Sequence, residues 1–159
     1  MKNRWMALGL ALCMILMTFT GCQNSEKAEA AYRDNVTEAV TKINTANTEF
    51  SEAMRAFFQD LSEEKRTAAI SAAADLQEGY RTLGALEAPN KYREIQADYA
   101  AGTGSVIQAI DLYKNEIQAV TEETFDETFA ERLQAGDELL SSGNEKIVGA
   151  TEKLQNLGE

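Results

Sequence analysis

Hydrophobic residues recur every three or four positions along most of the chain, which is the spacing of one face of an α-helix. The first series, from Tyr32 to Leu61, predicts a helix over residues 26–59, and such a helix is about 50 Å long. The second series runs from Ile70 to Leu86. Gly84 and the Ala88-Pro89-Asn90 turn indicate where this second helix ends. Helices of this kind need a packing partner to be stable.

Two further series complete the pattern, one from Tyr92 to Val120 and one from Phe125 to Leu157. Gly102-Thr103-Gly104 lies inside the third, where either the helix bends or another backbone comes close. Because the series keeps its phase across these glycines, close packing is favoured. In the fourth series Gly136 and Gly143 lie on the packing stripe, although Ser141-Ser142-Gly143-Asn144 alternatively breaks the helix.

Capping-box spacings at Asp60 with Glu63 and at Thr124 with Glu127 predict the starts of the second and fourth helices. No segment alternates with the period of two that a strand requires. The pattern therefore predicts an all-α domain over residues 31–159. We expect an antiparallel up-and-down bundle of four helices, three long and one short.

The first residues have a different character from this domain. Lys2 and Arg4 supply two positive charges, and no charged residue follows from Trp5 to Phe19. This apolar run is about 15 residues long, whereas a helix needs roughly 20 to span a bilayer. Residues 1–21 are therefore predicted to be a cleaved signal peptide.

The segment Phe19-Thr20-Gly21-Cys22 resembles the lipobox of bacterial lipoproteins, with Phe19 in place of the usual aliphatic residue. The resemblance implies cleavage between Gly21 and Cys22, and transfer of a diacylglycerol to the Cys22 thiol. Residues 22–30 would then be a lipidated tether on the extracytoplasmic face of the cell membrane, since two acyl chains anchor a protein stably. The alternatives are a plain signal peptide or a short uncleaved anchor with an incidental cysteine.

Composition narrows the classes of function. Residues 22–159 contain 13 basic and 26 acidic residues, a net charge of −13, which disfavours nucleic acid and anionic lipid as partners. Histidine is absent, so the commonest general base and transition-metal ligand are missing. Cys13 lies in the leader, which leaves Cys22 without a disulfide partner. No cofactor is expected.

No catalytic or metal-binding motif emerges from the remaining residues. The acidic run from Glu122 to Glu127 lacks the ligand pattern of an EF-hand and suits the start of a helix. Gly102-Thr103-Gly104-Ser105 does not match a nucleophile elbow. Glu63 and Glu64 are adjacent on a helix and are expected to be surface charges. We therefore expect no enzyme activity.

Five tyrosines lie on the apolar series, and tyrosine at a helix seam usually buries its ring and leaves its hydroxyl at the rim. Core filling is the expectation for all five, which are Tyr32, Tyr80, Tyr92, Tyr99 and Tyr113. For Tyr92, Tyr99 and Tyr113 the alternative is that they line a groove for a peptide or small ligand, with a pocket near Tyr99. Asn47 lies on the first stripe, where a polar residue sets helix register or faces a wet end.

A second resemblance involves the stretch from Leu86 to Tyr92 and the segment Ile110-Asp111-Leu112-Tyr113. The leucine, the Ala-Pro turn and the tyrosine-containing helix resemble those of small helical lipoproteins of Gram-positive bacteria. This likeness implies a surface lipoprotein bundle and supplies no catalytic residue. The expected function is a membrane-anchored interaction or scaffolding module with a protein partner. The alternative is a ligand-binding or sensory bundle.

Overall fold

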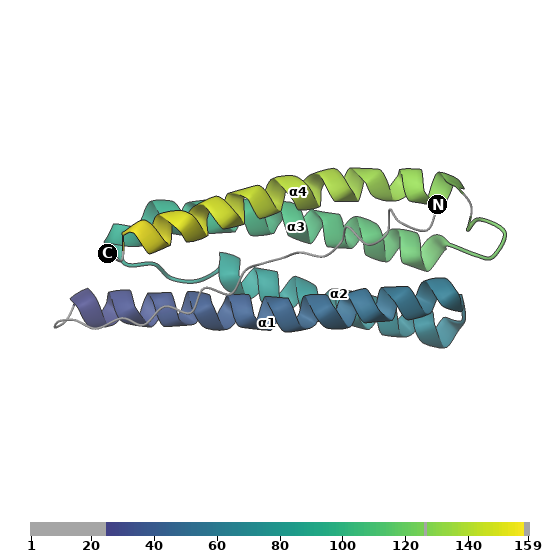
Figure 1. Cartoon of the computed structure of the whole chain (residues 1–159), viewed down its shortest axis with the longest axis horizontal. Coiled ribbons are helices and arrows are strands. Elements are labelled where there is room, and N and C mark those ends of the chain that lie inside the picture. Colours follow the sequence, from purple (N-terminus) through teal and green to yellow (C-terminus); the bar gives the residue numbers. More distant parts are fainter. Residues whose placement is uncertain (1–24, 126, 158–159) are drawn as a thin grey trace.

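The computed structural model describes residues 25–125 and 127–157. Within these ranges the chain forms four α-helices and no strand, which confirms the all-α fold (Figure 1). The helices are α1 (Ser25–Gln59), α2 (Glu63–Gly84), α3 (Arg93–Ala119) and α4 (Glu127–Asn156), and a short 3-10 helix, η2 (Asn90–Tyr92), precedes α3. The expected signal peptide, with Gly21 and Cys22, lies outside the described residues.

The helices pack in chain order, with α1 against α2, α2 against α3, and α3 against α4. Consecutive helices run in opposite directions, so the start of α1 and the end of α4 lie at one end of the bundle (Figure 1). We call this end the base, and the opposite end, with residues 60–62 and 120–125, the tip. The backbones of α1 and α4 approach less closely than those of the other neighbouring pairs.

The core follows the predicted stripes closely. Every residue of the third series is buried, from Tyr92 to Val120, and Ile110 is only 1% exposed. The fourth series is exposed at its two ends, where Phe125 and Leu157 reach the solvent. On α1 the side chain of Asn47 is partly exposed at the edge of the core. The hydrophobic periodicity therefore identified the packing face of each helix.

Glycines bring α3 and α4 together, as the spacing predicts. An added Cβ on Gly143 would lie 2.6 Å from Cγ2 of Val106, and one on Gly136 would lie 2.6 Å from the ring of Tyr113. Both distances are too short for a side chain, so only glycine allows this approach. The helix does not break at residues 141–144, because α4 is continuous through them.

Three boundaries differ from the predictions. Helix α1 begins at Ser25, one residue before the predicted start at 26, so residues 25–30 of the expected tether are helical. The N-cap of α2 is Ser62 and not Asp60; the Asp60 carboxylate instead accepts hydrogen bonds from the Ser62 amide and hydroxyl. Helix α4 starts at Glu127, and the Thr124 hydroxyl accepts a hydrogen bond from the Thr121 amide. Both capping boxes were wrong because these side chains bond within the preceding turns.

Candidate functional site

A buried glutamine ties three helices together at the base. The Gln96 amide nitrogen on α3 donates to the carbonyl oxygens of Leu83 and Gly84, at 3.0 Å each, where α2 ends. Its amide oxygen accepts a hydrogen bond from the Tyr32 hydroxyl on α1, at 2.8 Å. The last carbonyls of a helix have no partner within the helix. Gln96 therefore caps α2 while it binds α1, a role that its position beside the apolar series did not indicate.

Tyr92 forms the second part of the base. Its ring stacks on that of Tyr32, with centroids 5.3 Å apart, and is fully buried. The Arg33 guanidinium donates a hydrogen bond to the Tyr92 hydroxyl, and the Lys91 ammonium lies 3.1 Å from the carboxylate of Glu29. The hydrogen bond to Glu29 is the main reason that the pKa of Lys91 is raised. These contacts join the start of α1 to η2.

The other tyrosines are core residues. Tyr99 forms a hydrogen bond with the Thr151 hydroxyl at 3.0 Å, and Tyr113 donates one to the Asp137 carboxylate at 2.6 Å. Burial raises the pKa of both phenols, and for Tyr113 the carboxylate of Asp137 adds to the effect. The Tyr80 hydroxyl has no hydrogen-bond partner among the described residues, and burial raises its pKa to about 12.

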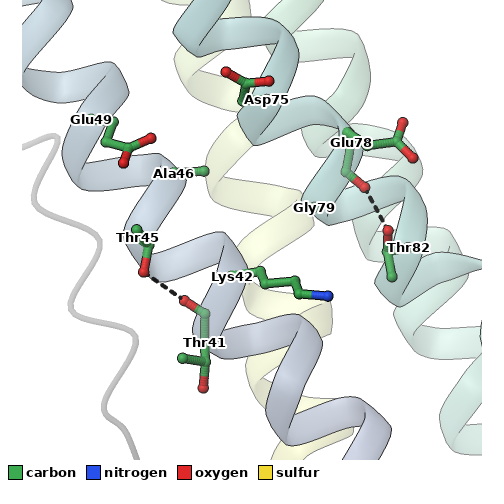
Figure 2. A pocket seen from close by; sticks show the side chains of 9 residues that line it. All are labelled: Thr41, Lys42, Thr45, Ala46, Glu49, Asp75, Glu78, Gly79 and Thr82. Carbon is green, nitrogen blue, oxygen red and sulfur yellow. Dashed lines mark hydrogen bonds between the residues drawn. The ribbon is translucent and has the colours of Figure 1, made fainter.

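The three tyrosines proposed to line a groove do not do so in this structure. The rings of Tyr92, Tyr99 and Tyr113 are at most 4% exposed. A surface hollow of about 440 Å³ instead lies between α1 and α2 (Figure 2). It is open and mostly lined by polar side chains, and Gly79 forms part of its floor. A second hollow lies at the base beside Tyr32 and Pro89.

The tip contains a cluster of four phenylalanines from α1, α4 and the loop before α4. Phe58 stacks on Phe125, with ring centroids 5.7 Å apart, and meets Phe129 edge-on at 5.9 Å. Phe57 lies beside Phe58 at 5.7 Å. Phe57 and Phe129 are buried, whereas Phe125 is 38% exposed. The cluster joins α1 to α4, and it leaves Phe125 exposed and Phe58 partly exposed.

Two arginines at the tip share one arrangement. The Arg66 guanidinium lies 5.4 Å from the centre of the Phe57 ring, and its Nε is 3.2 Å from the Glu63 carboxylate. The Arg132 guanidinium lies 5.5 Å from the centre of the Phe129 ring, and its Nε is 2.7 Å from the carboxylate of Glu116. Each cation therefore has an aromatic ring and a carboxylate as partners.

Acidic residues are concentrated toward the tip. We divide each helix at its middle into a base half and a tip half. The base half, residues 25–43, 74–106 and 141–157, includes eleven acidic and eight basic residues, a net charge of −3. Residues 44–73, 107–125 and 127–140, in the tip half, include thirteen acidic and five basic residues, a net charge of −8. In the described structure, Glu122 and Glu123 are exposed and form no ion pair. The long axis of the bundle thus has a charge gradient.

The remaining acidic candidates are ordinary surface charges. Glu63 pairs with Arg66 and Glu64 with Lys65, and both glutamates are exposed. Among the described side chains, no three carboxylates or cysteines lie close enough together to hold a metal ion. In the same part of the chain, no helix is both long and apolar enough to cross a bilayer.

Comparisons with known proteins place the chain in no family. No protein-family model, curated protein or solved structure matches the sequence.

Proposed function

We propose that the protein is a lipoprotein anchored through Cys22 to the extracytoplasmic face of the cell membrane, where its bundle acts as a non-enzymatic interaction module. The observation that carries this proposal is the sequence Phe19-Thr20-Gly21-Cys22 directly after a charged start and an apolar run. A lipid on Cys22 supplies the anchor, and two acyl chains are enough to hold it.

The start of α1 supports a close attachment to the membrane. Only Gln23 and Asn24 separate Cys22 from Ser25, the first residue of α1. Three residue steps span at most about 11 Å of extended chain. The base of the bundle would therefore lie next to the lipid headgroups, and the tip about 50 Å away along α1.

The charge gradient supports an upright orientation on this anchor. Anionic lipids repel negative charge within about a Debye length of the surface, roughly 8 Å at physiological salt. The tip half has a net charge of −8 and the base half −3, so the repulsion is smallest when the base faces the membrane. An upright bundle presents its tip to other molecules.

A role in interaction is supported by the nature of the exposed groups. The hydroxyls of Tyr99 and Tyr113 are bonded within the bundle, and Arg66 and Arg132 at the tip are paired with carboxylates. The exposed groups include many carboxylates and the ring of Phe125, which suit the binding of another molecule.

Lipidation is tested with Cys22→Ala in the full-length protein. We expect this variant to lose incorporation of labelled fatty acid and to leave the membrane fraction or stay unprocessed. Cys13→Ala is the matched control, because Cys13 lies in the segment to be removed and the variant should be lipidated normally. Mass spectrometry showing an unmodified thiol on Cys22 of the native protein would refute the anchor.

A further inference from the structure

We propose that the tip binds a basic segment of a partner protein, with Phe125 and the carboxylates of Glu122 and Glu123 as the contact residues. This proposal rests on the interaction role argued above and names its surface and the chemistry of its partner. The three residues lie within four consecutive positions of the loop before α4. All three are exposed.

The chemistry of the partner follows from the two arginine sites beside this loop. Arg66 and Arg132 each lie on a phenylalanine ring and pair with a carboxylate. At the base, Lys91 lies 5.3 Å from the centre of the Tyr92 ring and pairs with Glu29, which is the same combination. Phe125 is a further ring with carboxylates next to it in sequence, but this chain supplies no cation to Glu122 or Glu123 within its described part.

A cation from another molecule would complete the arrangement. An arginine or lysine side chain gains from both the face of an aromatic ring and an adjacent carboxylate. The neighbouring Phe58 ring, stacked on Phe125, adds apolar surface for the stem of such a side chain. A partner segment with arginine or lysine next to an apolar residue therefore matches the tip.

Other occupants match less well. A nucleic acid or another polyanion would be repelled by the tip half, with its net charge of −8. A second copy of this chain would bring one acidic tip against another, at a cost from like charges. The charge also steers a basic partner toward the tip, because opposite potentials raise the rate of encounter.

The test measures binding of the full-length protein in detergent micelles to a fluorescent peptide of alternating arginine and leucine. A peptide with glutamate in place of arginine is the probe control and should not bind. Phe125→Ala should weaken binding about fivefold, the share expected of one exposed cation–π contact. Phe125→Leu should weaken it as well, since leucine keeps the apolar surface and removes the ring.

The carboxylates are tested with Glu122→Gln combined with Glu123→Gln. This variant should bind several-fold more weakly at low salt, with a smaller difference at high salt because salt screens exposed charges. The control is Glu145→Gln combined with Glu152→Gln on α4. This control changes the net charge by the same amount but at positions far from the loop. Val148→Ala, at a 44% exposed apolar position, is the control for Phe125→Ala.

The proposal is overturned if either control variant weakens binding as much as its counterpart. Binding of the peptide would then depend on the overall net charge, or on exposed apolar surface in general, and not on the tip. It is also overturned if both Phe125 variants bind as the wild type does while melting at the same temperature. Neither result would affect the lipidation of Cys22, which is assayed separately. The two experiments therefore distinguish a failure of the proposed lipid anchor from a failure of the proposed binding at the tip.

Discussion

Gly102 on α3 and Gly143 on α4 face each other so closely that neither position has room for a methyl group. A Cβ on Gly102 would lie 2.8 Å from the carbonyl oxygen of Gly143, and a Cβ on Gly143 would lie 2.7 Å from that of Gly102. The obstacle on each side is backbone, which cannot rotate away as a side chain can. The closest seam of the bundle therefore depends on this pair.

Alanine at either glycine should destabilise the protein. Gly102→Ala and Gly143→Ala should each lower the free energy of unfolding by about 1–3 kcal/mol, the usual cost of overpacking. Gly104→Ala and Gly149→Ala should instead raise it by about 0.5–1 kcal/mol, because an added Cβ meets nothing within 4 Å there and alanine favours a helix. Urea unfolding followed by circular dichroism measures all four. Equal stability of Gly102→Ala and Gly104→Ala would contradict the close contact.

Tyr113 and Tyr80 allow the contribution of a buried hydroxyl to stability to be compared with and without a hydrogen-bond partner. Tyr113→Phe removes a hydrogen bond to the Asp137 carboxylate and should cost about 1 kcal/mol of unfolding free energy. Tyr80→Phe removes a buried hydroxyl that has no partner in the described structure, so it should be neutral or stabilising. Thermal melting of the two variants decides the matter. A larger loss for Tyr80→Phe would mean that its hydroxyl has a partner.

Stability should fall at alkaline pH. Burial raises the pKa of Tyr32, Tyr80, Tyr99 and Tyr113 above the ordinary value of 10.0, so the folded state holds these protons more tightly than the unfolded state. The stability that these protons contribute is fully present below pH 10.0. It is lost as the pH rises through the pKa values of the folded state, and the pKa of Tyr80 in that state is about 12. Unfolding free energies on either side of pH 10.0 measure the effect. A flat profile there would show that the phenols ionise alike in both states.

Gln96 should matter more than its polar character suggests. Gln96→Leu keeps the size of the side chain but removes the side-chain donor to the carbonyls of Leu83 and Gly84 and the acceptor of the Tyr32 hydroxyl. The Leu83 carbonyl keeps a hydrogen bond from the Leu86 amide. We expect a loss of about 2–4 kcal/mol in unfolding free energy, because unpaired buried polar groups are costly. Gln108→Leu, at an exposed position on the same helix, is the control. Similar melting of the two variants would sink this role.

The sequence predicted the helices well because their burial follows from a simple period. The series from Tyr92 to Val120 is buried throughout, and the position of Pro89 marks where η2 begins. The capping residues were predicted less well, since Asp60 and Thr124 had competing hydrogen-bond partners two and three residues away. Periodicity indicates which face is buried, but the choice between local hydrogen bonds depends on geometry.

The features that make up the candidate site were largely invisible in the sequence. Gln96 is next to Ile95 and outside the apolar series, and only the fold places it under the last carbonyls of α2. Phe58 precedes Phe125 by more than sixty positions, so no local pattern indicates that their rings stack. The concentration of acidic residues at the tip likewise depends on knowing which helix ends lie together.

The base of the bundle is joined by hydrogen bonds around Gln96 as well as by the stacked rings of Tyr32 and Tyr92, whereas the tip is joined mainly by phenylalanine rings. Apolar contacts weaken on cooling because their hydration has a large heat capacity. Cold should therefore loosen the junction of Phe58 with Phe125 before the polar junction at the other end. Chilling would release the end farthest from Cys22 while the end nearest it stays closed.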